Sequence, residues 1–118
     1  MHQEKPSSPT FVWFHNHSAK PAASTKFYTE LLGWKHAEGP PGMTMLAADA
    51  APFAGLGDLD GVTAGWVPFV EVDDVDGATK RATKLGANVI KARTRGPAGE
   101  FAIVRDPGGA AFALWQKA

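Results

Sequence analysis

Residues 26–34 read KFYTELLGW, a stretch that ends a predicted helix and begins a predicted strand. Gly33 is the residue type that most often terminates a helix, and residues 34–38 are typical of a short strand. Pro21 suits the first turn of this helix, and Ser18 is the expected N-cap. Apolar residues recur upstream at helical spacing, which predicts one buried helix face: Ala23, Phe27, Tyr28, Leu31 and Leu32.

The predicted strands on either side of this helix make up the first half of the chain. Residues 11–17 mix aromatic and polar residues after a proline, which favours a strand. Gly39-Pro40-Pro41-Gly42 predicts a turn between strands 34–38 and 43–48. A third, weaker strand is expected at 53–56, and residues 57–65 are expected to form a connecting loop.

The second half repeats this order. Its expected helix is capped by Asp73-Asp74 and closed by Gly86, so both helices end in Leu-Gly, at Leu32-Gly33 and Leu85-Gly86. Aspartates 73, 74 and 76 are explained by capping rather than by a metal. The remaining elements are expected as strand 66–72, strand 88–92, loop 93–99, strand 101–105, turn 106–109 and strand 110–115.

The repeated order predicts an α+β fold of tandem βαβββ modules that form a curved mixed sheet, shaped as a cup. We expect a polar, flexible tail at 1–9 and a single domain at 10–118, with modules at about 10–57 and 65–117. Each module is too small to bury its sheet alone. The modules therefore pair within one chain or exchange across a homodimer, and the sequence leaves both arrangements open.

Composition excludes several function classes. Twelve basic residues balance twelve acidic ones, so the surplus positive charge typical of nucleic-acid binding is missing. No apolar run approaches the length of a membrane span, and the chain has no cysteine for disulfides or thiolate metal sites. We expect a cytoplasmic protein that binds neither nucleic acid nor membrane.

Three ordered motifs resemble the vicinal oxygen chelate superfamily. They are residues 27–34, residues 72–76 with Leu85-Gly86-Ala87, and residues 101–110, FAIVRDPGGA. This superfamily includes glyoxalase I, bleomycin resistance proteins and extradiol dioxygenases. The resemblance covers about residues 11–116 and implies the fold named for those three members, with a site in the cup that commonly holds a divalent metal.

The same resemblance argues against that metal in this chain. Active members take one ligand from each of four strands, and three of these positions correspond here to Trp13, Val67 and Ala113. None of the three side chains binds a metal, and segment 52–57, which holds the fourth position, has no carboxylate or imidazole. We therefore expect a metal-less member without a cofactor; a divalent metal bound by displaced ligands is the alternative.

Strand alternation predicts the cup lining. Trp13, His15 and His17 share one face of the first strand, which the family register turns toward the cup. His15 and His17 are candidate catalytic bases, with Glu71 as the orienting acid; the alternative is that they cap the strand end without chemistry. Arg93 and Arg95 are candidate rim clamps for an anionic group, unless they lie on a solvated loop. The expected ligand-binding residues are Trp13, His15, His17, Val67, Phe69, Glu71, Ala113, Trp115, Arg93 and Arg95.

Three functions follow from this lining. The first is a module, completed in a homodimer, that binds an aromatic or amphipathic small molecule without a metal. The second is a lyase or isomerase that uses His15 or His17 as a general base. The third is a metal-dependent glyoxalase or dioxygenase with displaced ligands. The sequence does not identify the ligand.

Overall fold

The computed structural model of the chain describes residues 8–118 and contains one eight-stranded sheet with two helices. Most of the tail expected at 1–9 lies outside the described residues. Neither helix in the described part has the length and apolar character needed to cross a bilayer. In chain order the elements are β1 (Phe11–Ser18), α1 (Pro21–Leu32), β2 (Lys35–Glu38), β3 (Met43–Ala47), β4 (Pro52–Asp58), β5 (Gly65–Glu71), α2 (Val75–Lys84), β6 (Asn88–Gly96), β7 (Gly99–Arg105) and β8 (Ala111–Lys117).

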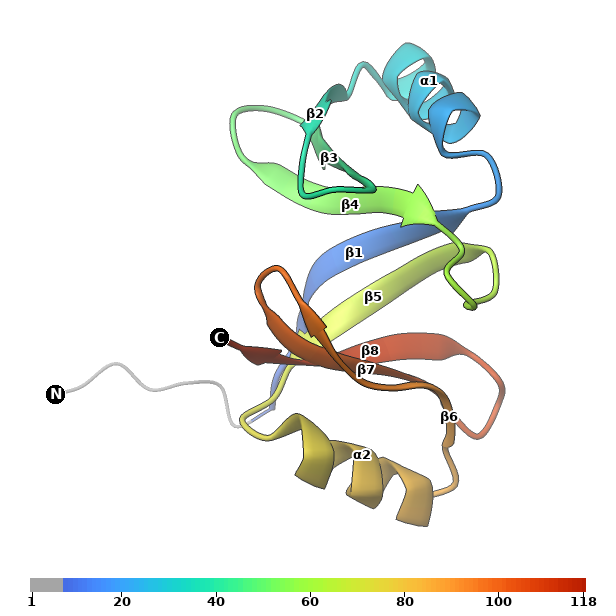
Figure 1. Ribbon diagram of the computed structural model, residues 1–118, viewed down its shortest axis with the longest axis vertical. Helices are drawn as coiled ribbons and strands as arrows, with labels where there is room; N and C mark the ends of the chain where they lie inside the picture. The colour runs from blue at the N-terminus through green and yellow to red at the C-terminus, as the bar shows by residue number, and fades with distance from the viewer. Residues whose placement is uncertain (1–7) are drawn as a thin grey trace, which may run out of the picture.

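The strand order confirms the tandem βαβββ fold. It runs β2-β3-β4-β1-β5-β8-β7-β6, so β1 and β5 lie at the centre and each module forms one wing. β1 pairs antiparallel with β5, whereas the β1–β4 and β5–β8 pairs are parallel, which makes the sheet mixed. The two modules therefore pair within the chain. α1 lies at one end of the molecule and α2 at the other, with the central strands between them (Figure 1).

The ends of α1 show one correct and one incorrect expectation. Gly33 has a φ of 73°, and its N–H donates to the carbonyl of Thr29, so the predicted glycine stop is confirmed. Ser18 is not the N-cap, because Lys20 occupies that position. The Ser18 hydroxyl instead accepts the Lys20 N–H at 2.9 Å and lies 2.6 Å from the Ser24 hydroxyl.

The N-terminus of α2 is capped by another strand rather than by its own aspartates. Asp74 occupies the N-cap position, but its side chain makes no capping hydrogen bond. The side-chain oxygen Oε1 of Gln116, in β8, accepts the Val75 N–H at 2.9 Å. A residue 41 positions away in the sequence therefore accepts the hydrogen bond from the Val75 N–H, which we had expected an aspartate side chain to accept.

The loop expected at 93–99 is mostly strand. β6 continues to Gly96 because Thr94 pairs with Phe101 and Arg95 pairs with Glu100 in β7. Backbone pairing with a neighbouring strand supplies the hydrogen bonds that the local composition did not suggest.

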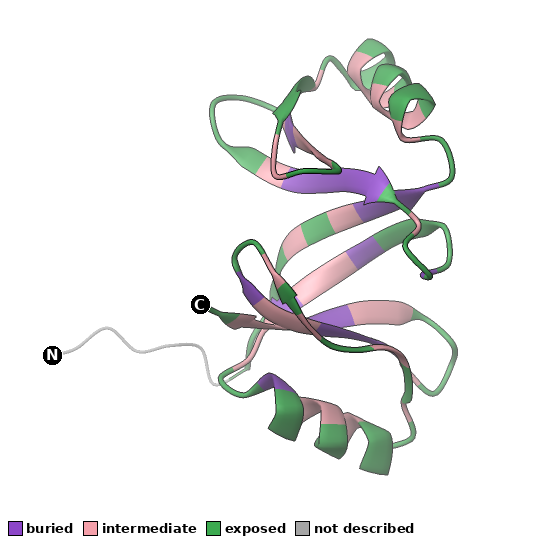
Figure 2. Cartoon of the chain, in the orientation of Figure 1, coloured by how far each residue is buried: buried purple, intermediate pink, exposed green. Residues whose placement is uncertain are grey.

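Apolar side chains gather in three clusters on the two faces of the sheet. Val70, Val75 and Val104 belong to the cluster beneath α2, and Leu46 and Leu56 belong to the cluster on the α1 side. The third cluster lies on the opposite face and includes Val67 and Ile103. Figure 2 shows that buried residues concentrate in the strands, whereas the outward surfaces of both helices are exposed.

Most of the apolar stripe expected to bury α1 faces outward, and of its five residues only Tyr28 is half-buried, where it packs on the cluster of Leu46 and Leu56. Phe27 and Leu31 are 56% and 64% exposed, and no residue of α1 is fully buried. The half-buried side of this helix carries mostly polar residues, including Ser24, Thr25 and Thr29. The side of α1 that faces the sheet is therefore mostly polar, and the side that faces outward is mostly apolar, which is the opposite of the usual arrangement for a helix packed on a core.

Candidate functional site

Two histidines lie together on the face of β1 that is opposite the helices. His15 pairs with Gly55 of β4 on one side and with Val67 of β5 on the other. The His15 and His17 ring centroids are 4.8 Å apart, with the rings tilted by 57°. The structure thus confirms that these histidines share one face, as strand alternation predicts.

Gly55 in β4 provides the space for the His15 ring. A Cβ added at Gly55 would lie 2.9 Å from His15 Nδ1, whereas one at Gly57 would lie 2.8 Å from the carbonyl oxygen of Gly42. Glycine inside a strand often marks such a close approach. Gly55 was therefore a sequence signal for the site, although sequence reasoning did not use it.

Burial keeps both imidazoles neutral at pH 7. It lowers the pKa of His15 from 6.5 to about 4, and the neighbouring His17 contributes to this decrease. Burial also lowers the pKa of His17, although the Asp58 backbone acts in the opposite direction and raises it. His17 is 8% exposed, and within residues 8–118 neither of its ring nitrogens has a hydrogen-bond partner of normal geometry. Both rings can therefore accept a hydrogen bond or a proton.

The loop between β4 and β5 covers the histidine end of this face. Val62 is 4% exposed and packs in one cluster with Val67, Ile103 and Ala113. The loop is held at two further points: Lys91 Nζ donates to Asp60 Oδ2 at 3.1 Å, and an Arg105 guanidinium nitrogen donates to the Thr63 hydroxyl at 2.6 Å.

This loop changes the role expected for two lining residues. Val67 and Ala113, predicted to line an open cup, are 2% and 0% exposed. They form the apolar floor on which Val62 rests, so in this structure they are not accessible to a ligand. Sequence reasoning missed the loop because residues 57–65 have neither helical nor strand periodicity.

Aromatic side chains line the other end of the same face. Trp13 pairs with Phe69, and Phe101 pairs with Trp115. The Phe69 and Phe101 rings are 5.8 Å apart. All four side chains are half-buried, and we call Trp13, Phe69, Phe101 and Trp115 the aromatic wall. Phe101 was not among the predicted site residues, although its alternation with Ile103 placed it on this face.

Glu71 does not lie beside the histidines. Val67 is the residue of β5 opposite His15, and Glu71 lies four residues further along the strand, next to Trp115 of β8. Four strand residues span roughly 13 Å, so the predicted acid–base arrangement with Glu71 is not formed. The carboxylate that acts on the pKa of His17 is Asp60, which is already paired with Lys91.

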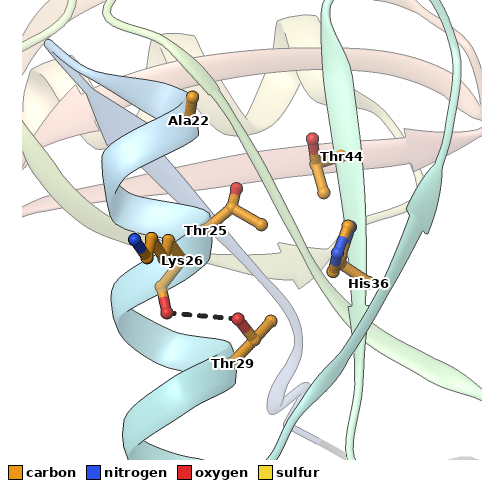
Figure 3. A pocket seen from close by; sticks show the side chains of 6 residues that line it. All are labelled: Ala22, Thr25, Lys26, Thr29, His36 and Thr44. Atoms are coloured by element: carbon orange, nitrogen blue, oxygen red, sulfur yellow. Dashed lines mark hydrogen bonds between the residues drawn. The ribbon is translucent and has the colours of Figure 1, made fainter.

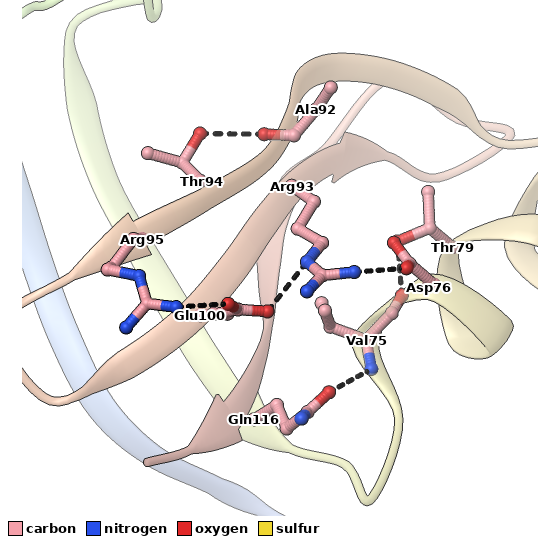
Figure 4. A network of polar contacts seen from close by, with 9 residues as sticks. All are labelled: Val75, Asp76, Thr79, Ala92, Arg93, Thr94, Arg95, Glu100 and Gln116. Carbon is pink, nitrogen blue, oxygen red and sulfur yellow. Dashed lines mark hydrogen bonds and ion pairs between the residues drawn. The ribbon is translucent and has the colours of Figure 1, made fainter.

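Arg93 and Arg95 do not form the predicted clamp at the cup rim. Arg93 contacts Asp76 of α2, and its Nε lies 2.6 Å from Glu100 Oε1. Arg95 pairs with the other oxygen of Glu100 at 3.3 Å. Figure 4 shows that this network joins α2 to β6 and β7. The two guanidinium groups are on the helix side of the sheet and stabilise its edge.

The residues of this face do not fit the metal centre usual for the fold. His15 and His17 supply two imidazoles, but residues 8–118 contain no group of three histidine, cysteine, aspartate or glutamate side chains placed to hold an ion. Tryptophan, valine and alanine occupy three of the positions where the resemblance places ligands.

A separate hollow of about 390 Å³ lies between α1 and strands β2 and β3. Thr25 and Thr29 from the helix lie opposite His36 and Thr44 from the strands (Figure 3). Thr29 donates its hydroxyl hydrogen to the backbone carbonyl of Lys26. This hollow is on the helix side of the sheet, whereas the two histidines are on the opposite face.

Comparison with known proteins agrees with this fold. Residues 13–115 match the family model described as a glyoxalase-like domain. The anthracycline biosynthesis protein DnrV of Streptomyces peucetius is 32% identical, over 95% of this chain and 48% of that protein. The putative glyoxylase CFP32 of Mycobacterium bovis is 34% identical, over 88% of this chain and 44% of that protein. The chain therefore spans about half the length of these curated relatives.

Two solved structures show the same fold at low sequence identity. A glyoxalase/bleomycin resistance protein/dioxygenase superfamily member from Vibrio splendidus has a TM-score of 0.63 at 18% identity, with 94% of this chain and 100% of that chain covered. Methylmalonyl-CoA epimerase from Mycobacterium tuberculosis has a TM-score of 0.59 at 18% identity, with 99% and 94% covered. At this identity the likeness concerns the arrangement of the strands and helices alone.

Proposed function

Since the chain belongs to the glyoxalase-like family, we propose that it binds a small organic molecule on the face opposite its helices, without a metal. The observation that carries this proposal is the aromatic wall beside two neutral histidines. Ligand pockets commonly combine aromatic walls with a few polar anchors. The ligand is therefore a flat aromatic or amphipathic compound that stacks on the wall and donates a hydrogen bond to His15.

One relative supports the aromatic character of this ligand. DnrV is described as an anthracycline biosynthesis protein, and anthracyclines contain a planar fused-ring system. A planar ring system has the shape that stacks against tryptophan and phenylalanine side chains. An anthracycline is thus the first probe to test with this chain.

Binding is measured by thermal shift and by tryptophan fluorescence with three probe classes: an anthracycline, a 2-oxoacid and a thiol conjugate. A ligand of the native state raises the melting temperature. We expect Trp115→Ala to weaken binding of the aromatic probe about tenfold or more, because a stacking contact is lost. Trp34→Phe is the matched control, since Trp34 packs with Tyr28 and Phe53 outside the aromatic wall. Equal affinity of Trp115→Ala and the wild type would contradict the proposed site.

The second candidate function is that of a lyase or isomerase, and the neutral state of His15 favours it. A neutral imidazole can accept a proton from a carbon next to a carbonyl group, which leaves an enolate. A pKa of about 4 makes His15 a weak base, so the substrate must be readily enolised. With a probe that is turned over, His15→Gln abolishes turnover, whereas Glu71→Gln retains it because of the distance between these side chains.

We also propose that the chain assembles as a homodimer. The curated relatives are about twice as long as this chain, so they have room for a second unit of similar size. A second copy of this chain would supply a unit of that size and of the same fold.

A further inference from the structure

The outer surface of α1 and the centre of the helix side carry a set of exposed apolar side chains. Residues 11, 14 and 66 belong to β1 and β5 and are 37–53% exposed, whereas residues 27 and 31 belong to α1 and are 56–64% exposed. Phe11 pairs with Val70, which packs in the cluster beneath α2, so Phe11 is on the helix side. We call these five residues the apolar strip: Phe11, Phe14, Phe27, Leu31 and Trp66. Monomeric proteins rarely leave so many large apolar side chains together in water.

Side-chain contacts connect the two parts of this strip. The Phe27 ring lies 5.2 Å from the Tyr28 ring, and the Tyr28 ring lies 5.4 Å from the Trp66 ring. The Trp66 Nε1–H donates to the Tyr28 hydroxyl at 3.0 Å. Phe14 is on the same face of β1 as Asn16, which pairs with Trp66. A chain of aromatic contacts therefore joins Phe27 on the helix to Trp66 on the central strands.

From this surface we propose that the apolar strip is the interface with a second copy of this chain, related by a two-fold axis. This inference gives the surface for the homodimer proposed above and rests on that proposal. It is independent of the ligand site, which lies on the opposite face of the sheet.

The size of the strip fits such an interface. Given side-chain areas of roughly 150–250 Å², its five members expose about 500 Å². A standard interface buries about 800 Å² per partner, of which a little over half is apolar, or about 450 Å². The strip thus supplies the apolar part of one standard interface. The chain has no net charge that would oppose self-association.

Charged residues of α1 add complementarity to this arrangement. Lys26 and Glu30 flank Phe27 and Leu31 on the exposed side of the helix, and their side chains are 76% and 68% exposed. When two copies of α1 lie antiparallel about a two-fold axis, Lys26 of one copy approaches Glu30 of the other. The same two residues are 3.9 Å apart within the chain, so the pair can be shared across the interface.

Sedimentation equilibrium of the full chain over a range of concentrations tests this proposal. We expect a wild-type dimer and a monomeric Phe27→Glu variant, because the new carboxylate would be buried without a partner. Leu85→Glu is the matched control, since Leu85 is a 68% exposed apolar residue outside the strip, and it should remain dimeric. Circular dichroism confirms that each variant is folded, and Leu31→Glu provides a second test if Phe27→Glu is not.

Charge substitutions test the antiparallel geometry. Lys26→Glu alone and Glu30→Lys alone place like charges opposite each other, so each variant should dimerise more weakly than the wild type. Mixing these two variants restores opposite charges across the interface and should restore the dimer. A mixture that stays as weak as its components would overturn the antiparallel pairing.

Other results would overturn the interface or the dimer as a whole. A wild-type dimer that persists in both Phe27→Glu and Leu31→Glu places the interface on another surface. A wild-type monomer at every concentration excludes self-association and leaves the strip for a different partner. Neither result changes binding of the aromatic probes, so failure of this inference is distinguishable from failure of the ligand site.

Discussion

The low pKa of His15 makes the stability of the folded chain depend on pH. Its pKa is about 4 in the folded chain against 6.5 as the ordinary value, because the ring is buried and lies beside His17. Between these two values the unfolded chain binds a proton at this position and the folded chain does not. The free energy of unfolding therefore falls as the pH decreases from about 6.5 toward 4, and the full stability is present above pH 6.5.

The size of this effect follows from the two pKa values. A difference from 6.5 to about 4 corresponds to at most about 3.5 kcal/mol, at about 1.4 kcal/mol for each pH unit. His17 contributes in the same direction, because burial also lowers its pKa. A loss of this size is a large part of the stability of a small domain.

Urea unfolding, followed by tryptophan fluorescence at several pH values from 7 to 4, measures the effect. The wild type should lose more stability than His15→Gln over this range, because the variant has no ring to protonate. His36→Gln is the matched control, since His36 is exposed in β2 and outside the site. Identical pH dependence of the wild type and His15→Gln would refute the assignment of this effect to His15.

Three further substitutions have defined outcomes in urea or thermal unfolding. Gly99→Ala should lower the free energy of unfolding by at least about 3 kcal/mol, because the new Cβ would lie 2.1 Å from the backbone oxygen of Gln116. Gly42→Ala should lower it far less, because a Cβ at Gly42 would enter open space. Similar losses for the two variants would contradict this reasoning. Val62→Ala should cost roughly 2 kcal/mol and speed amide hydrogen exchange in residues 59–64; unchanged exchange would show that Val62 does not hold the loop. Gln116→Leu should cost about 1 kcal/mol, because the Val75 N–H loses its acceptor; an unchanged melting temperature would contradict that role.

Much of the fold was predictable from local patterns. The two Leu-Gly helix ends, the turn-forming stretches and the alternation in the strands gave the order of elements and the tandem modules. Expectations failed where a distant residue supplied the hydrogen bonds, as Gln116 does for α2 and as β7 does for the end of β6. Local sequence carries no information about such a partner.

The candidate site shows the same division. Alternation correctly placed His15 and Trp13 on one face, because successive strand residues point to opposite sides. It could not give the distance between Glu71 and His15, which depends on the register of β5 against β1. It also gave no sign that Val62 would cover the floor of the face.

By itself, the sequence determined the type and order of the elements, the absence of metal ligands at three of the expected positions and the face on which the histidines lie. These properties depend on backbone preferences and on the two-residue period of a strand, which act over a few neighbours. Only the tertiary structure decided how low the pKa of His15 falls, where Arg93 and Glu71 lie, and that the apolar side of α1 faces outward. Burial and register arise from packing between distant segments, so no local pattern could specify them.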